Sequence, residues 1–215
     1  NFNSTLTLQD NPGEIIVETG ALKFTVNKNG FYLFNSDLVL AREGKEYYSH
    51  LDKNYQLTVE ESGPLRACLK AKGWFVSEKG EKFCQFIVRI YAFAGASYVR
   101  VQHTFVYTGY PENKVHYLYK GKRLPKNETI EAVYIKTPLK IEEESKFTFA
   151  ADNKVMQSTV SDTVDFLQDK ANGYSLAKDG QVINYGNKLD GWIDVSTQAE
   201  GMAIGVKNFW QQALQ

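Results

Sequence analysis

The chain has 215 residues, of which 43% are apolar, and its 25 basic residues are balanced by 25 acidic ones. This length and composition can bury a sizeable core, so the chain is globular and not disordered. A formal net charge of +0 gives no electrostatic footprint for nucleic acid, and no apolar run approaches the roughly 20 residues that cross a bilayer. We therefore expect neither nucleic acid nor a membrane as a partner.

The first third of the chain predicts a meander of short strands separated by turn residues. The predicted strands lie in Glu14 to Val26, where two strands flank Thr19-Gly20, and in Phe31 to Phe34, Tyr55 to Glu60 and Leu65 to Val76.

The two cysteines, Cys68 and Cys84, lie on the two strands of a predicted hairpin that turns near Ser77 to Gly80. In that register Cys84 faces a position near Trp74 or Phe75, about 20 Å from Cys68 at roughly 3.3 Å per residue. A disulfide needs Cα atoms within about 7 Å of each other. We therefore expect two free, mostly buried thiols.

The passage from Glu81 to Thr108 has the strongest strand signal, because two runs rich in Val, Ile, Phe and Tyr flank Gly95 and Ala96. Gly followed by Ala is typical of a two-residue type II′ hairpin turn with Gly first. This turn predicts a register that pairs Tyr91 with Arg100, Arg89 with Gln102, and Val88 with His103.

One face of this hairpin is predicted to be polar and the other to be core. The polar face carries Gln85, Arg89, Tyr91, Arg100, Gln102 and Thr104. The core face carries Phe86, Val88, Ile90, Val99, Val101, His103 and Phe105. Two arginines beside a tyrosine and a glutamine can bind an acidic, hydroxyl-rich ligand, because guanidinium groups bind carboxylates in a planar fork. The alternative is a solvated face of an antiparallel sheet.

Beyond the hairpin, Ile130 to Leu139 predicts a further strand, and Ala150 to Lys170 favours strands with a helical turn at Lys154 to Ser158 as the alternative. No apolar stripe with a 3.6-residue period reaches the length of a helix. The predicted fold class is therefore all-β, a large antiparallel, supersandwich-like β-sandwich with few or no long helices, as one domain over residues 1–215.

Blocks in the last third of the chain, together with the central hairpin, resemble a known family. The blocks are Tyr91 to Phe105, Gly191-Trp192-Ile193-Asp194-Val195-Ser196, Gly201 to Val206 and Phe209-Trp210-Gln211-Gln212. Their order, from about Glu14 to Gln212, resembles the central β-sandwich of exo-acting rhamnogalacturonan lyases and their uncharacterised bacterial relatives. Relatives usually continue the last block with an aromatic or apolar residue and then Pro-Lys before the Ala-Leu pair, whereas here Ala213-Leu214 follow Gln212 directly.

The resemblance implies that the chain is part of a larger multidomain protein, a polysaccharide lyase acting on rhamnogalacturonan-type pectin by β-elimination. Its partners would be an acidic polysaccharide or oligosaccharide and a helical domain of the same protein. We expect the isolated chain to be inactive, and the protein to be secreted, periplasmic or at the cell surface.

Such an elimination needs a group that neutralises the uronate carboxylate, a base for the proton at C5 and an acid for the leaving oxygen. Arg89 and Arg100, with Gln102 beside them, are candidates for binding the carboxylate, and His103, Tyr91 or Tyr107 for the base. His103 lies among apolar residues, which favours a hydrogen-bonded core histidine as the alternative.

Two tryptophans, Trp192 and Trp210, are candidates for stacking on sugar rings, with core packing as the alternative in strands of Ile, Val and Met. His50 and His116 have no second ligand at metal spacing, so we predict neither a metal site nor a cofactor.

Two other functions stay open: a non-catalytic carbohydrate-binding or structural scaffold domain, and an immunoglobulin-like interaction module that uses exposed edge strands. A serine hydrolase is disfavoured because the chain has no Gly-x-Ser-x-Gly motif.

Overall fold

The structure is a computed structural model and describes residues 5–108, 130–138, 146–159, 164–170, 172–197 and 201–212. These residues form β-strands and one short 3-10 helix, which confirms the predicted all-β sandwich class. No helix among them is long and apolar enough to cross a membrane. His116 and the Ala213-Leu214 pair lie outside the described residues.

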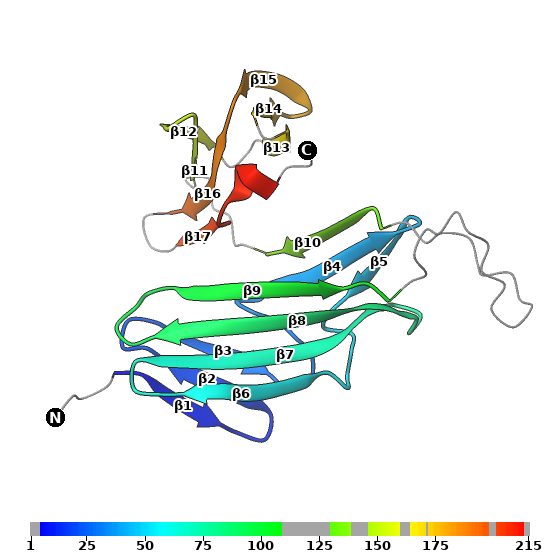
Figure 1. The fold of residues 1–215 in the computed structure, drawn as a ribbon, viewed down its shortest axis with the longest axis vertical. Coiled ribbons are helices and arrows are strands. Elements are labelled where there is room, and N and C mark those ends of the chain that lie inside the picture. Colours follow the sequence, from blue (N-terminus) through cyan, green and yellow to red (C-terminus); the bar gives the residue numbers. More distant parts are fainter. Residues whose placement is uncertain are drawn as a thin grey trace, which may run out of the picture. The chain divides into compact units, whose positions relative to one another are not determined.

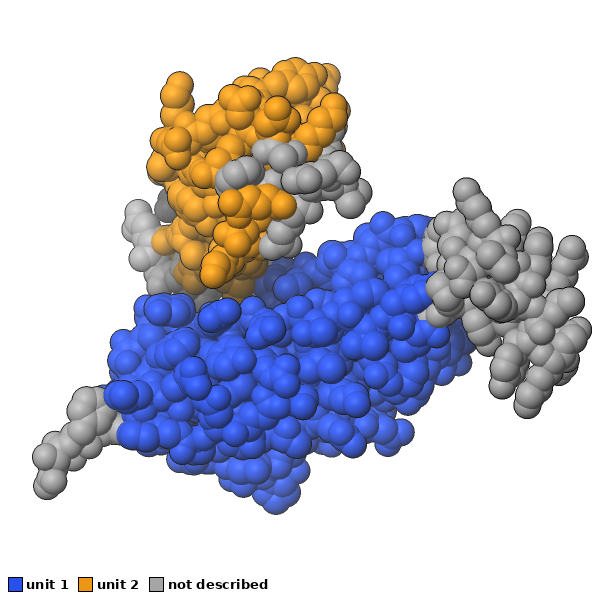
Figure 2. Space-filling view, in the orientation of Figure 1, with its two compact units in different colours: residues 1–138 blue, residues 139–215 orange. Residues whose placement is uncertain are grey.

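The chain divides into two compact units, residues 1–138 and residues 139–215, shown in different colours in Figure 2. Each unit is described by itself. A single domain over residues 1–215 stays a prediction.

Unit 1 contains two antiparallel sheets (Figure 1). Its strands are β1 (Thr7–Asp10), β2 (Glu14–Glu18), β3 (Lys23–Asn27), β4 (Asp37–Arg42), β5 (Lys45–Tyr48), β6 (Gln56–Ser62), β7 (Arg66–Ser77), β8 (Lys82–Phe93), β9 (Val99–Val106) and β10 (Ala132–Lys136). The small sheet has the order β1-β2-β3. The large sheet has the order β10-β4-β5-β7-β8-β9, with β6 paired to β7.

The small sheet packs on the large sheet through a shared apolar core. Ile15, Val17 and Val26 of the small sheet belong to the same buried cluster as Leu69 and Phe86 of the large one. From Cys84 to the end of β8 burial alternates residue by residue, because successive side chains point to opposite faces of a strand. The apolar face of the central hairpin in β8 is therefore core, as predicted.

The central hairpin has the predicted register but a different turn. β8 pairs with β9 so that Arg89 lies opposite Gln102, Tyr91 opposite Arg100, and Val88 opposite His103. The turn is closed by the Ala96 N–H, which donates to the Phe93 carbonyl at 3.1 Å, so Gly95 is its second central residue, with φ at 76°. A positive φ at that position is typical of type II, so the predicted type II′ turn with Gly95 first is wrong.

Thr19 connects the hairpin loop to the small sheet. Its side chain is fully buried, and its hydroxyl donates to the Ala96 carbonyl at 2.6 Å and accepts the Leu22 N–H at 2.9 Å. Its own carbonyl accepts the Gly95 N–H at 2.7 Å and the Thr5 hydroxyl at 2.8 Å. One residue of the first predicted turn therefore holds the end of the central hairpin in place.

The predicted strand at Phe31 to Phe34 is wrong. Leu33 and Ser36 form an isolated bridge around Phe34 and Asn35, whose φ angles are 51° and 59°. Residues in this left-handed region turn the chain and cannot continue an extended strand.

Both cysteines are free and buried, as predicted. Cys68 lies opposite Tyr91 in the β7–β8 pair. Cys84 has a φ of 59° and lies where the register of that pair shifts between Trp74 and Phe75. Its position opposite the far end of β7 agrees with the predicted separation.

Unit 2 contains a four-stranded sheet of order β12-β11-β16-β17 and a three-stranded sheet of order β13-β14-β15. Its elements are β11 (Lys146–Ala151), β12 (Lys154–Thr159), β13 (Val164–Lys170), β14 (Gly173–Lys178), β15 (Gln181–Gly186), β16 (Leu189–Ser196), β17 (Gly201–Gly205) and the 3-10 helix η1 (Phe209–Gln212). Phe149, Tyr174 and Leu189 form its buried core. The helical alternative at Lys154 to Ser158 is wrong, because this segment is β12.

Replacing Thr19 by valine, which keeps the shape and removes the hydroxyl, should lower the free energy of unfolding by about 1 to 3 kcal/mol, because the Ala96 carbonyl and the Leu22 N–H lose their partner. Urea unfolding followed by fluorescence measures this change. Thr58→Val is the matched control, since Thr58 is exposed on β6 and should change the free energy by less than about 0.5 kcal/mol. Equal losses in the two variants would contradict the role of Thr19.

Candidate functional site

The predicted polar face of the hairpin extends over β6, β7, β8 and β9, and we call it the outer face. It is formed by Glu60, Glu61, Arg66, Lys70, Lys72, Arg89, Tyr91, Arg100 and Gln102, which the strand registers place on one side of the sheet. Five of these side chains are basic and two are acidic. The outer face therefore carries an excess of positive charge in a chain that has none overall.

Arg89 is held by a carboxylate of the protein itself. Its Nε and Nη2 donate to the two oxygens of Glu60 at 2.6 and 3.1 Å, and Lys70 Nζ lies 3.0 Å from Glu60 Oε1. These hydrogen bonds, first from Arg89 and then from Lys70, lower the pKa of Glu60 to about 2. The planar fork of Arg89 is thus occupied by Glu60, and its predicted role in binding a ligand carboxylate stays a prediction.

Arg100 differs from Arg89 in its surroundings. It is exposed on β9, and no carboxylate among the described residues pairs with it. Its guanidinium carbon lies 5.9 Å from the ring centroid of Tyr91, and that of Arg66 lies at the same distance. Arg66 is in turn bound by Glu61 at 2.7 and 2.9 Å. On the outer face Arg100 is therefore the guanidinium that is open to a ligand.

Gln102 and Tyr91 flank Arg100. Gln102 follows two residues later on β9, on the same exposed face, and Tyr91 lies opposite Arg100 on β8. The structure thus brings three of the predicted site residues together: the guanidinium of Arg100, the amide of Gln102 along the same strand and the phenol of Tyr91 on the neighbouring strand.

His103 lies on the other side of the sheet from Arg100, as predicted by its assignment to the core face of the hairpin. Its ring packs edge-on against Phe75 with centroids 6.4 Å apart, and its Nε2 has no hydrogen-bond partner among the described residues. Burial lowers the pKa of His103, so the neutral imidazole is favoured. The sheet separates His103 from Arg100, and one bound ligand cannot contact both. Its catalytic role stays a prediction.

Two further predictions concern Val101, as a residue of the core face, and Tyr107, as a candidate base. Val101 is 40% exposed, because β9 is an edge strand, so its assignment to the core is wrong. Tyr107 packs edge-on against Phe83, with ring centroids 6.1 Å apart. This contact lies on the same side of the sheet as His103, away from Arg100.

Trp192 and Trp210 both belong to unit 2. Trp192 lies on β16, is 37% exposed and lines a small pocket of about 130 Å³ together with apolar side chains such as Phe166 and Ile204. Trp210 lies in η1, and its side chain is outside the described part of the structure. The outer face is formed by unit 1 alone, so sugar stacking by the two tryptophans stays a separate prediction.

A polar cluster at the start of β4 was not predicted. Asp37 accepts a hydrogen bond from the Ser49 hydroxyl at 2.6 Å and pairs with Nδ1 of His50. The ring of His50 stacks on Tyr32, with centroids 5.0 Å apart.

The β4–β5 hairpin positions this cluster. Its turn contains Glu43 and Gly44, both with positive φ, and it pairs Val39 with Tyr48. Two residues further from the turn, the same register places Asp37 opposite His50. A hairpin prediction from the Glu-Gly dipeptide could have found the pair.

No group of three or more His, Cys, Asp or Glu side chains in the described ranges is arranged to hold a metal ion.

The fold defines this protein as an all-β sandwich with a cationic, tyrosine-bearing sheet face. Residues 42–118 match the family model described as the PcRGLX-like protein central beta sandwich domain. This match agrees with the family that the sequence resembles, over the part of the chain that it covers. The matched part contains β5 to β9 and thus the whole outer face. No curated protein matches the chain.

The ion pairs of Glu60 predict a pH-dependent stability. Its pKa is about 2 in the folded protein and about 4.3 in an unfolded chain, so its contribution is present at neutral pH and is lost as the pH falls from about 5 to about 2. Glu60→Gln should therefore be less stable than the parent protein at pH 7, with a difference that shrinks towards pH 2. Denaturant unfolding at several pH values measures the difference. A difference that is independent of pH would show that the ion pairs contribute nothing.

Proposed function

We propose that this chain provides the acidic-oligosaccharide-binding sandwich of a polysaccharide lyase that cleaves rhamnogalacturonan-type pectin by β-elimination. The observation that carries the proposal is Arg100, an exposed guanidinium without a carboxylate partner in the described residues, between Tyr91 and Gln102. The family of residues 42–118 supports the carbohydrate-active context. Since pectin is an extracellular polymer, the proposal includes a secreted, periplasmic or cell-surface location.

The chemistry of the three side chains fits a uronate residue. A guanidinium can donate two parallel hydrogen bonds to the carboxylate, and the amide of Gln102 can both donate to and accept from sugar hydroxyls. The excess of basic side chains on the outer face attracts a polyanion towards this point. Arg100 would bind the carboxylate, while Gln102 and Tyr91 would orient the ring.

The arrangement favours binding over complete catalysis. Of the predicted bases, Tyr91 shares the face of Arg100, whereas His103 and Tyr107 lie on the other side of the sheet. We therefore assign the binding of the carboxylate to this chain, and we propose that a helical domain of the same protein completes the active site.

A non-catalytic scaffold is the second candidate function. The internal pairing of Arg89 with Glu60 favours it, because a stabilising ion pair of this kind is what a purely structural sheet face would show. The two candidates differ in whether Arg100 contacts a sugar.

Calorimetric titration of the purified chain with rhamnogalacturonan oligosaccharides tests the proposal. Arg100→Ala should raise the dissociation constant by about 10- to 150-fold, the range for losing a charge-assisted hydrogen bond. Arg66→Ala is the matched control. It also removes one positive charge from the outer face, but the arginine that it removes is already bound by Glu61. Its effect should stay within about threefold.

Two results would contradict the proposal: no binding at millimolar oligosaccharide, or equal losses in the two arginine variants. Absorbance of unsaturated uronate, followed in the same samples, separates binding from turnover. We expect no absorbance increase with the isolated chain.

A further inference from the structure

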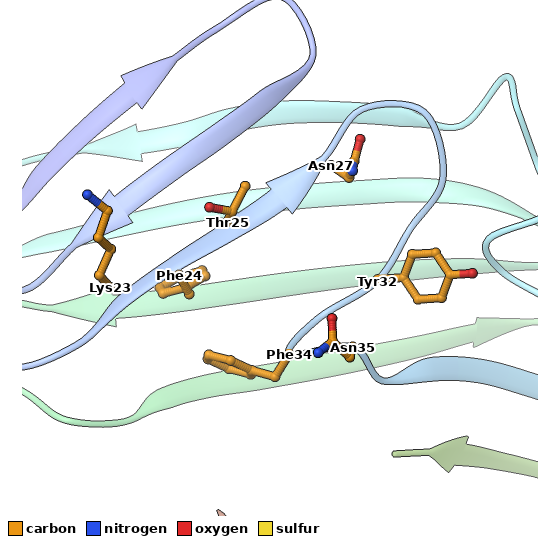
Figure 3. Close-up of a pocket in the computed structure, with 7 residues that line it drawn as sticks. All are labelled: Lys23, Phe24, Thr25, Asn27, Tyr32, Phe34 and Asn35. Atoms are coloured by element: carbon orange, nitrogen blue, oxygen red, sulfur yellow. The ribbon is translucent and has the colours of Figure 1, made fainter. Parts of the chain in front are cut away.

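A pocket of about 400 Å³ lies beside β3 (Figure 3), and its lining residues precede the segment that matches the family. Lys23, Phe24, Thr25 and Asn27 of β3 line one side of it. Tyr32, Phe34 and Asn35, from the segment that turns back after β3, line the other. Its volume falls in the range of small-molecule sites, about 300 to 1,000 Å³.

The side of the pocket formed by β3 offers both side-chain and backbone hydrogen-bonding groups. β3 is one of the two edge strands of the small sheet, and Lys23, Thr25 and Asn27 are exposed along it. The Lys28 N–H donates to Gly13 at 2.8 Å. Hydrogen-bonded and non-hydrogen-bonded residue pairs alternate along antiparallel strands. Lys28 is in a hydrogen-bonded pair, so Thr25, three residues before it, is in a non-hydrogen-bonded pair with β2. The backbone N–H and carbonyl of Thr25 therefore face the unpaired edge of β3. The pocket can therefore hydrogen-bond a ligand at several points.

The opposite side of the pocket contains a strained aromatic residue. Phe34 has a φ of 51° in a two-residue turn with Asn35, where Asn-Gly is the favoured pair. A bulky residue in this conformation is unfavourable and persists where the surrounding structure holds it. The ring of Phe34 packs 5.5 Å from that of Phe24. The strained turn thus keeps an aromatic ring in the wall of the pocket where a smaller residue would suit the backbone better.

The side of the pocket that contains Tyr32 is supported by the polar cluster at the start of β4, formed by Asp37, Ser49 and His50. Tyr32 stacks on His50, which is fixed by Asp37. Gly30 allows the segment to lie close to this cluster, because a Cβ there would be 2.7 Å from the His50 carbonyl oxygen. The aromatic wall is therefore preorganised, which reduces the entropy lost on binding.

We propose that this pocket binds a neutral pyranose ring of a saccharide. The ring of Phe34 can pack on the apolar face of a sugar, and the amides of Asn27 and Asn35 can donate to and accept from its hydroxyls. The one cation of the lining, Lys23, is paired with Glu18, so the pocket has no free charge for a uronate. A neutral sugar is therefore a better match than an acidic one.

Nuclear magnetic resonance titration of the full chain with methyl α-L-rhamnopyranoside and with methyl β-D-galactopyranoside tests the proposal. At least one glycoside should shift the amide signals of Thr25, Asn27, Tyr32 and Asn35. Thr25→Val and Asn35→Gly should each weaken the binding about 3- to 10-fold, the range for one hydrogen bond. Asn35→Gly suits the turn, so it should leave the fold intact.

Phe34→Asn tests the aromatic wall separately. Asn is well tolerated at positive φ, so the variant should fold and yet lose at least tenfold in affinity for the glycoside. Thr58→Val, an exposed threonine on β6, is the matched control for Thr25→Val and should leave the affinity unchanged.

Three outcomes would overturn the proposal. They are the absence of shifts around the pocket with either glycoside, equal weakening in Thr58→Val, and shifts of the β3 amides with an extended Val-Thr peptide but not with sugars. The last outcome would make the edge of β3 a strand-pairing site. Arg100→Ala should leave the binding of the neutral glycoside to the β3 pocket unchanged. The proposal for this pocket and the proposal for the outer face can therefore fail independently of each other.

Discussion

The antiparallel pairing of β7, β8 and β9 is the constraint on which the rest of unit 1 depends. Arg89 lies opposite Gln102, and side chains alternate between the two faces of the sheet. Val88 and Ile90 therefore point into the core, while Tyr91 and Arg100 lie on the outer face. A shift of one residue would exchange the two faces. The core and the candidate binding surface therefore have a single origin, and Thr19 secures the register by fixing the loop that joins β8 to β9.

On the outer face, one bulge gives two arginines on neighbouring strands different surroundings. The register of β6 and β7 shifts between Val59 and Glu61, and the extra residue, Glu60, projects its carboxylate onto Arg89. Arg100, one strand further out, is beyond its reach. Self-pairing thus stabilises the centre of the face, and the open guanidinium is left at the edge strand β9.

Period-two alternation explains what could be predicted from the sequence. It gave the strands of the central hairpin, their register and the grouping of Arg100 with Tyr91 and Gln102. It could not reveal β4, because the first four of the six residues of Asp37–Arg42 are all buried and the pattern does not alternate. The Arg89–Glu60 pair and the turn at Gly95 also escaped prediction, because both depend on contacts between residues far apart in the sequence.

The central claim is that an acidic saccharide binds at Arg100 on the outer face. Amide shift mapping of the full chain with a rhamnogalacturonan tetrasaccharide tests it most directly, because it locates the ligand without any substitution. The account predicts the largest shifts at Arg100, Gln102 and Tyr91, with His103 affected less. Shifts confined to the core face around His103, or to unit 2 around Trp192, would contradict it.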